Sequence, residues 1–526
     1  PSCSMAVPAA CRMRSYRGSW FLAFQSGAAS LTGTGRAYLK NHRTFPEVRL
    51  AEWTKTENVL SAGQNGRYAL RVTTTAALPY DQRPPNKHLG HIQGDYGYPF
   101  LGRTIEMVKD PNALFADQYQ RFGRISRTSI TGFKTVVLNH PDYADVVLLD
   151  RDKNFSCKMG WKGHMEEFFD GGLVMRDFGE HRNHRRIATE SFRREAMVEY
   201  ATQVNSVTEA TVKRWGETRE MLIYDGIKRL LLDIAFGVFC WLDERDTAEI
   251  PKINRAFSDM MEGAVGMVRI NVPGTVYHRG LKGRAYLKRF FLERIDRKRA
   301  SDDRDSFAAF CRATMEDGQP YSDEDIANHM VFLMLAAHDT TASAATMAAY
   351  HLANNPDIQD QLAADVLATP RPIGYDTMFR TLPLMAGVFH ETIRMHPPVA
   401  MLLRRTVNAC TIDNVQVPAD TMVCVPVAFL QRHPDFWSNP NTFDPSRFDE
   451  GREEHKRHPF MWMPFGGGAH KCIGLHFARL LFTSLYAELL SQYRIEFQKP
   501  NYFPTKVQNL PFAKPTDGLP IRLVPR

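Results

Sequence analysis

The sequence predicts a mainly α-helical fold with a smaller β-rich lobe. Three observations lead to this prediction. The apolar segment 322–354 has the length and the capping residues of one long buried helix. A second apolar helical run, residues 475–485, directly follows a glycine-rich loop. Short β-type segments lie between the helical stretches, chiefly at 132–139, 415–429, 493–497 and 521–524.

Composition places the chain among globular proteins, since 44% of its 526 residues are hydrophobic. The eight cysteines include no Cys-x-x-Cys pair, which argues against a disulfide framework or a zinc site and for a reducing compartment. Of the net charge of +8, +7 falls in residues 1–71, so the overall basicity gives no reason to expect nucleic-acid binding. No run of 18 or more apolar residues occurs. We therefore expect a cytoplasmic protein with no transmembrane anchor.

Residues 1–71 show weak periodicity and are predicted to be a leader that is disordered or non-native. One interpretation is translated sequence upstream of a bacterial start at Val72, because a GTG start codon would otherwise read as valine. The alternatives are a targeting peptide, since the stretch is rich in Arg and Ser, and a genuine disordered arm. Residues 72–93 are then a linker, and 94–526 form the main domain.

The main domain is expected to open with a turn-rich segment, Gly94–Gly102, and to continue with a helix at 111–122. A strand at 132–139 and a helix at 141–149 follow. Residues 155–169 are aromatic and contain glycine, so we expect an irregular segment there. Two helices are expected between 251 and 300, on either side of a break at Pro273 and Gly274.

A basic helix is predicted to begin at Gly179. His181 and Arg185 are four residues apart in it and therefore share one face. Fixed positive charge of this kind suits a carboxylate ligand, because arginine pairs with carboxylates bidentately. The alternative is a solvated basic face. A zinc site is not favoured, because no carboxylate or cysteine partner stands at ligand spacing.

The long helix is expected to begin at Ser322, with Asp325 completing a start that resembles a capping box. In its middle, Asp339 and Thr340 place a carboxylate and a hydroxyl inside an apolar helix, which is unfavourable unless the groups are paired or used. Ala336 is small enough to let a planar group come close. The alternative for the threonine hydroxyls is a hydrogen bond back to the helix carbonyls.

Two further segments carry charge or a thiol. Glu391 and Arg394 lie three apart on a helix expected at 384–395 and can form a buried ion pair. The stretch Phe465-Gly-Gly-Gly-Ala-His-Lys-Cys-Ile-Gly474 is a flexible loop that delivers one thiolate, that of Cys472. A helix beginning just after Cys472 would favour the thiolate form. The alternative is a buried structural cysteine.

This loop resembles the haem-thiolate loop of the cytochrome P450 superfamily, and specifically its soluble bacterial type. The basic helix, the acid–alcohol helix, the Glu-x-x-Arg motif, a segment containing Arg447 and Cys472 occur in family order over roughly residues 90–526. The resemblance implies the cytochrome P450 fold, with a single haem b between the long helix and the cysteine loop. It also implies that the thiolate of Cys472 is the axial iron ligand, which favours O–O cleavage.

The resemblance further implies roles for other residues. Phe465 lies near the sulfur, Gly474 and Ala336 lie against the haem, and Asp339 and Thr340 relay protons. The propionate contacts are His470, His181, Arg185 and Arg404. Arg405 is the rival of Arg404, because the turn that anchors the comparison has Asp420 where glycine is usual. Glu391, Arg394 and Arg447 form a structural triad of one acid and two arginines.

The implied activity is hydroxylation of a C–H bond with dioxygen and two electrons from a redox partner. The break at Pro273 and Gly274 resembles the branch that oxidises retinoids, sterols and other terpenoids, so the expected substrate is a lipophilic terpenoid, steroid, retinoid or fatty acid. A ferredoxin and ferredoxin reductase are the expected electron donors, docking near Lys471 and Arg479. The alternatives are a haem-thiolate ligand-binding or sensing protein and a peroxide-driven hydroxylase.

Overall fold

The computed structural model describes seven strands within residues 1–71, and residues 78–526 except 242–247, 267–268, 317, 501, 503–506 and 510–511. The chain divides into two compact units, Pro1–Gln82 and Arg83–Arg526. The division at 82 lies between the two boundaries expected from the sequence, at 71 and 93.

The first unit contains strands where the sequence indicated no folded element. They are β1 (Ser4–Met5), β2 (Cys11–Tyr16), β3 (Ser19–Phe24), β4 (Gly27–Thr32), β5 (Arg36–Leu39), β6 (Val59–Ala62) and β7 (Tyr68–Arg71). They pair in the orders β1-β7-β6 and β2-β3-β4-β5, antiparallel throughout. Backbone pairing of this kind needs no periodic apolar face, so weak periodicity did not reveal it. That residues 1–71 are a non-native leader stays a prediction.

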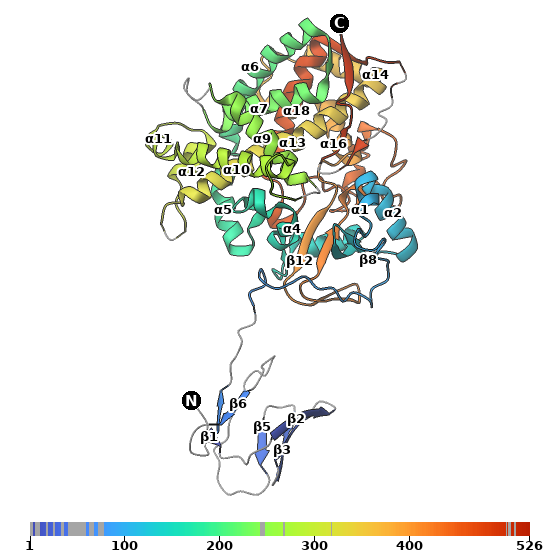
Figure 1. Ribbon diagram of the computed structural model, residues 1–526. Helices are drawn as coiled ribbons and strands as arrows, with labels where there is room; N and C mark the ends of the chain where they lie inside the picture. Colours follow the sequence, from blue (N-terminus) through green and yellow to red (C-terminus); the bar gives the residue numbers. More distant parts are fainter. Residues whose placement is uncertain are drawn as a thin grey trace. The chain divides into compact units, whose positions relative to one another are not determined.

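The second unit is mainly helical, as predicted (Figure 1). Its helices are α1 (Thr104–Lys109), α2 (Pro111–Phe122), α3 (Pro141–Leu149), α4 (Cys157–Phe169), α5 (Phe178–Glu190), α6 (Arg194–Thr218), α7 (Ile223–Phe239), α9 (Ile250–Val265), α10 (Val276–Leu292), α11 (Ile295–Ala300), α12 (Ser306–Arg312), α13 (Asp323–Asn354), α14 (Pro356–Ala368), α15 (Tyr375–Arg380), α16 (Pro383–Met395), α17 (Val427–Leu430) and α18 (Leu475–Gln492). Short 3-10 turns are η1 (Leu173–Met175), η2 (Pro445–Phe448), η3 (Glu454–Lys456) and η4 (Gly468–His470).

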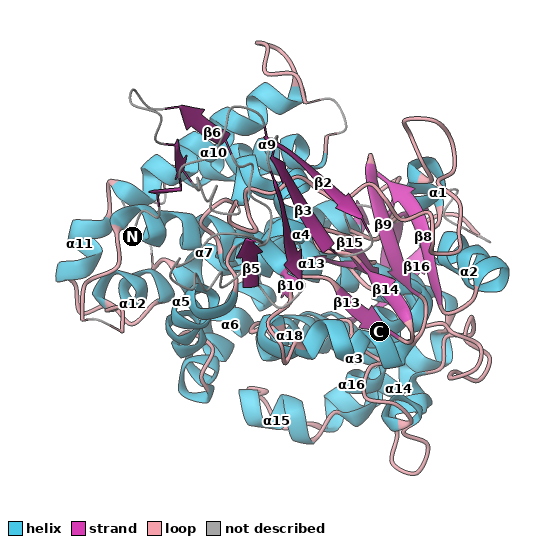
Figure 2. Ribbon diagram, turned by 90° about the horizontal axis from the view of Figure 1, so that it is seen from below, coloured by secondary structure: helices cyan, strands magenta, loops and turns pink. Residues whose placement is uncertain are grey.

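The smaller β-rich lobe centres on a mixed five-stranded sheet of order β10-β12-β15-β9-β8, in which only β9 and β15 pair in parallel among the described strands (Figure 2). Its strands are β8 (Ile125–Ile130), β9 (Phe133–Leu138), β10 (Phe155–Ser156), β12 (Leu402–Thr406) and β15 (Met422–Val425). The smaller sheets are made of β11 (Glu220–Leu222), β16 (Tyr493–Phe497) and β19 (Pro520–Pro525), of β13 (Cys410–Ile412) with β14 (Val415–Val417), and of β17 (Val507–Gln508) with β18 (Lys514–Pro515).

The prediction of an irregular segment at 155–169 was wrong, because most of it is helix α4. Ser156 caps this helix by accepting a hydrogen bond from the N–H of Met159 at 2.9 Å. Gly160 packs directly on β12, where a Cβ atom would lie 2.6 Å from the carbonyl carbon of Leu403. Tertiary contact therefore overrides the weak helix propensity of the glycines.

Helix α13 crosses the larger core and begins at its N-cap Ser322, which accepts from the N–H of Asp325 at 3.0 Å. It packs against α7, α10, α16 and α18, and Figure 1 shows these helices around it. In the part of the chain that the structure describes, residues 468–492 are long and apolar enough to cross a membrane, but 61% of their 18-residue apolar stretch is buried inside the protein. Burial of this kind is what a core helix shows.

Candidate functional site

The cysteine loop is held closed at its base and open at its thiol. The N–H of Cys472 donates to the carbonyl of Phe465 at 2.9 Å, which joins the two ends of the loop. Gly468 has φ +61°, and a Cβ atom there would lie 1.8 Å from the carbonyl oxygen of Leu148 in α3, so only glycine fits. Cys472 itself is exposed and free. The loop therefore presents one thiol on a fixed backbone.

Protein surrounds Cys472 on most sides although its side chain keeps accessible surface. Burial accordingly raises the pKa of the thiol, while the N–H of Gly474 and the charges of Arg185 and Lys471 oppose the rise. The N-terminus of α18 begins at Leu475, directly after the loop. The groups that favour the thiolate are thus present, and a cation bound at sulfur would add to them.

Helix α13 has one open position in its buried middle. Ala336 is exposed and Ala337 half-buried, whereas the residues from Thr341 to Ala349 are all buried. Thr340 is half-buried, and its hydroxyl donates back to the carbonyl of Ala336 at 2.9 Å. The alternative weighed for the threonine hydroxyls is therefore what Thr340 adopts in this structure. The helix also leaves Ala336 accessible within its largely buried middle.

Four basic side chains from three elements meet near the cysteine loop. His181 and Arg185 come from α5, Arg404 from β12 and His470 from η4. The rings of His181 and His470 lie 3.8 Å apart between centroids. Burial, together with Arg185 and Arg404, lowers the pKa of His181 to about 4. Burial and Arg404 likewise lower the pKa of His470 to about 2, so both rings are neutral at pH 7.

No member of this basic cluster forms an ion pair within 4.0 Å with a carboxylate among the residues that the structure describes. Burial raises the pKa of Asp150, and the charge of Arg404 reaches this carboxyl and opposes the rise. Arg404 is only 4% exposed, and its Nη1 donates to its neighbour's carbonyl, that of Leu403, at 2.9 Å. Burial lowers the pKa of Arg185. Buried positive charge without a partner is unfavourable, which favours an anionic ligand at this place.

Arg404 and Arg405 point to different surroundings, as neighbours on a strand do. Arg405 lies 3.2 Å from Asp420 and also donates to the carbonyl of Arg83, so its charge is already engaged. Asp420 has φ +61°, the left-handed conformation that glycine usually supplies in such a turn. The departure from glycine at this position therefore leaves the turn intact, and Arg404 is the arginine that joins the basic cluster.

Asp339 is turned away from Thr340 and toward α7. Its Oδ1 lies 3.1 Å from Nζ of Lys228 and 3.3 Å from Nδ1 of His338. Burial opposes ionisation, but His338 and Lys228 outweigh it and lower the pKa of Asp339 to about 2. No hydrogen bond joins the side chains of Asp339 and Thr340 among the contacts of the described residues. The structure thus places both predicted residues on α13 but does not bring them into contact.

The Glu391, Arg394 and Arg447 side chains meet as an almost solvent-free network. Arg394 binds Glu391 through two hydrogen bonds of 2.6 and 2.8 Å, and Nε of Arg447 lies 3.2 Å from Glu391. The exposed fractions of the three side chains are 1% or less. A second acid, Glu454, lies 3.2 Å from Arg447. The network therefore extends beyond the three predicted residues, and Glu454 is shared with Arg452, which lies 2.6 Å from it.

Phe465 is half-buried and packs near Phe389 and Trp462, with ring centroids 6.3 and 6.2 Å apart. These contacts fix one end of the cysteine loop on α16. Gly474 lies two residues beyond the thiol, and a Cβ atom there would lie 3.8 Å from its sulfur. The loop, α13 and the basic cluster thus supply the parts expected of the site.

The residues present fit a haem on three observations. The thiol of Cys472 is exposed and free. The exposed methyl of Ala336 leaves room against an otherwise buried helix. The basic cluster holds positive charge that no described carboxylate pairs. A flat apolar group with two carboxylates would satisfy all three.

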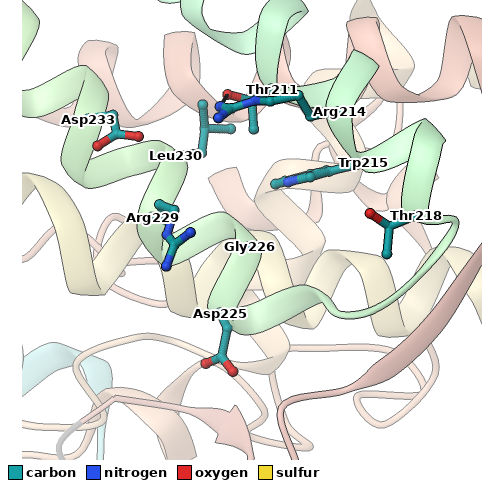
Figure 3. A pocket seen from close by; sticks show the side chains of 9 residues that line it. All are labelled: Thr211, Arg214, Trp215, Thr218, Asp225, Gly226, Arg229, Leu230 and Asp233. Carbon is teal, nitrogen blue, oxygen red and sulfur yellow. Dashed lines mark hydrogen bonds between the residues drawn. The ribbon is translucent and has the colours of Figure 1, made fainter.

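A separate cleft of about 370 Å³ lies between α6 and α7 (Figure 3). It is lined by Thr211, Arg214, Trp215, Thr218, Asp225, Gly226, Arg229, Leu230 and Asp233. None of the predicted site residues is among them. The cleft therefore does not belong to the site described above.

Sequence reasoning missed Lys228 and Glu454. Each stands outside any motif, and its partner lies far along the chain or in another turn: Lys228 is on α7, whereas Asp339 is on α13. The available signal for the partner of Asp339 was a cation on the side of α7 that faces the core, because buried charges are usually paired.

Comparisons with known proteins give the family and the fold of this chain. A family model described as Cytochrome P450 matches residues 92–521. A Mycobacterium tuberculosis protein that carries the name cytochrome P450 136 is 35% identical over 448 residues, which cover 84% of this chain and 90% of that protein. Abscisic acid 8'-hydroxylase 1 of Arabidopsis thaliana is 26% identical over 445 residues, covering 82% and 90%. The retinoic acid-bound structure of cyanobacterial CYP120A1 has a TM-score of 0.75 at 22% identity and covers 83% of this chain and 99% of its own, which shows a shared fold.

Proposed function

We propose that this chain, which belongs to the cytochrome P450 family, hydroxylates a C–H bond of a lipophilic small molecule. A ferredoxin would supply the electrons. The observation that carries the proposal is the meeting of an exposed thiol, an open position on α13 and an unpaired basic cluster. Each alone has a structural explanation. Together they support a haem, which we propose to be haem b, and the oxygen chemistry that a haem supplies.

The residues that would hold the haem follow from the site. Cys472 would supply the thiolate that holds the iron, and Phe465 and Gly474 would shape the loop beside it. His181, Arg185, Arg404 and His470 would receive the propionates, with the neutral histidines donating N–H groups and the arginines supplying charge. When bound, the haem supplies the activation of dioxygen that inserts one oxygen atom into a C–H bond.

Side chains of this protein would carry protons to the site. Thr340 carries a proton on Oγ1, which now points to the carbonyl of Ala336, and must turn from that carbonyl to donate elsewhere. Asp339 is ionised at pH 7 and held by Lys228. Lys228 is 25% exposed, so when the ion pair opens, Asp339 can take up a proton from solvent water on that side. We assign Lys228, Asp339 and Thr340 to one route for protons from solvent to the open side of α13.

The substrate class rests on the lining of the open side and on the relatives. Phe332 and Ala337 are half-buried apolar residues on the same helix as Ala336. The Arabidopsis relative is named for abscisic acid, and the structural neighbour was solved with retinoic acid. Terpenoids and retinoids are therefore the first compounds to test, followed by steroids and fatty acids.

The electron donor would dock on the face around the cysteine loop. Lys471 is exposed and directly precedes Cys472. The guanidinium of Arg479 lies over the ring of Phe379, 4.3 Å from its centroid, and burial lowers its pKa. These cations suit an acidic ferredoxin. A cytoplasmic location is part of the same proposal, because it supplies both a ferredoxin and a reducing environment.

One experiment separates the proposal from its alternatives. The purified protein is incubated with candidate substrates and either a ferredoxin with its reductase and NADPH, or hydrogen peroxide alone. Hydroxylated product in the first mixture supports the proposal. Product with peroxide only would indicate a peroxide-driven hydroxylase, and binding without product in either mixture would indicate a sensing protein.

A further inference from the structure

Helix α5 depends largely on polar contacts for its position. Of its four buried residues, only Ile187 and Ala188 are apolar, and the other two are His181 and His184. A helix that buries so little apolar surface gains little of its placement from core packing. Whatever polar contact fixes α5 therefore also fixes His181 and Arg185, the two members of the basic cluster that it carries.

His184 lies in the middle of a buried row of three hydrogen-bonding side chains. Nη1 of Arg176 lies 2.9 Å from Nε2 of His184, and Nδ1 of His184 lies 2.7 Å from Nε2 of His329 on α13. Burial lowers the pKa of His184 to about 4 and that of His329 to about 3, so both rings are neutral at pH 7. Arginine only donates, so Nε2 of His184 accepts, and its Nδ1–H donates to His329. We call Arg176, His184 and His329 the histidine chain.

The charged end of the histidine chain is already balanced. Arg176 is 6% exposed and forms ion pairs with Glu180 of α5 and Asp325 of α13. Its Nη2 and Nε donate to the carbonyl of Gly171 at 2.9 and 3.0 Å. Unlike the basic cluster, this charge needs no anionic ligand. Arg176 thus joins the segment before α5, α5 itself and the beginning of α13.

Aromatic rings hold both histidines of the chain in place. The ring of His184 meets the ring of Tyr321 edge to face, with 4.9 Å between centroids. The ring of His329 stacks on Phe310 of α12 at 5.2 Å, and the two planes differ by 8°. Rotation of either histidine would therefore break a ring contact and a hydrogen bond together. A buried polar network that is satisfied in this way is rigid.

We propose that the histidine chain positions the basic cluster for haem. Its three members hold α5 against α13, and they thereby direct His181 and Arg185 toward the haem carboxylates. His184 is three residues after His181 and directly before Arg185, so a shift of His184 moves both. Helix α13 carries the open position of the site, so the chain also sets the distance between two walls of that site. This inference rests on the haem site of the proposed function.

The test observes the haem carboxylates directly, in the full haem-loaded chain. It measures the propionate bending band by resonance Raman spectroscopy and the rate of haem transfer to apomyoglobin. His184→Leu leaves an N–H of Arg176 and Nε2 of His329 unpaired, so the band should shift and the transfer rate should rise about tenfold. His184→Gln offers an acceptor to Arg176 and a donor to His329, so it should restore both the band and the rate.

A second variant and a matched control complete the test. His329→Leu breaks the histidine chain from α13 and leaves the sequence of α5 unaltered. It should shift the band in the same direction as His184→Leu, and it carries the test if that variant does not fold. The control is His351→Leu, which removes another buried, neutral histidine of α13. The ring of His351 stacks on Phe443 and not on a residue of α5, so the band and the rate should stay unchanged.

Three results would overturn the inference. The first is an unshifted band with an unchanged transfer rate in both His184→Leu and His329→Leu. The second is an equal change in the His351→Leu control, which would indicate a general loss of stability. The third is a His184→Gln variant that behaves like His184→Leu, which would assign the effect to ring packing. These results leave the proposed function standing, whereas an unaltered chain that binds no haem would overturn both.

Discussion

Nζ of Lys228 lies 3.1 Å from Oδ1 of Asp339, so helix α7 holds the carboxylate that is buried in the middle of α13. Asp339 is 4% exposed, and an unpaired charge at such a position would be strongly unfavourable. The ion pair keeps the carboxylate ionised, with a pKa of about 2. It also keeps it away from Thr340. The pair must therefore open before Asp339 can pass a proton toward the open side of the helix.

Replacing Lys228 by Met should destabilise the protein at pH 7 by about 1 to 3 kcal/mol, because Asp339 loses its cation while Lys228 itself is partly solvated. The pKa of Asp339 is depressed in the folded state, so its stabilising contribution is present above its unfolded value, about 3.9. That contribution is lost as pH falls toward 2. The difference between the two proteins in urea unfolding should accordingly shrink between about pH 4 and pH 2. Lys228→Arg keeps a cation and is the control; a pH-independent difference would contradict the account.

Replacing Thr340 by Ala should uncouple electron use from product formation. The variant keeps the helix, since Thr340 is replaced by a better helix former, but it loses the hydroxyl that would donate the proton. Product per electron pair should fall about tenfold or more, and hydrogen peroxide should appear in its place. Thr340→Ser retains the hydroxyl and should stay coupled. Unchanged coupling in the alanine variant would remove Thr340 from the route.

Replacing Glu391 by Gln should cost about 3 to 5 kcal/mol of unfolding free energy, because Arg394 and Arg447 would lose a shared buried carboxylate. The loss should appear in urea unfolding and as a lower haem content after purification. Glu450→Gln alters an exposed acid of the same region and should change stability by less than about 0.5 kcal/mol. Equal stability of both variants would show that the network is not a scaffold.

Arg404→Leu and Arg405→Leu separate the two rival arginines. Arg404 has no described carboxylate partner, so its loss should leave folding intact and raise the rate of haem transfer to apomyoglobin about tenfold. Arg405 is bound to Asp420, so its loss should lower stability with little effect on haem transfer. The reverse pattern would assign the propionate contact to Arg405.

Much of this arrangement was accessible from the sequence because it depends on local patterns. The spacing of Glu391 and Arg394, the glycines around Cys472 and the cap at Ser322 are each set by neighbours in the chain. Helix α4 was missed because its stability comes from β12, which lies over 230 residues later. Lys228 and Glu454 were missed for a similar reason. The fold determines which residue pairs with a buried charge, and no spacing in the sequence predicts that residue.

The central claim is that Cys472 binds haem iron as a thiolate. The carbon monoxide difference spectrum of the dithionite-reduced protein tests it most directly. The account predicts a Soret band at the position typical of thiolate-ligated haem, and its loss in Cys472→Ala. A band at the position of neutral-thiol or imidazole ligation, or no haem band at all, would contradict it.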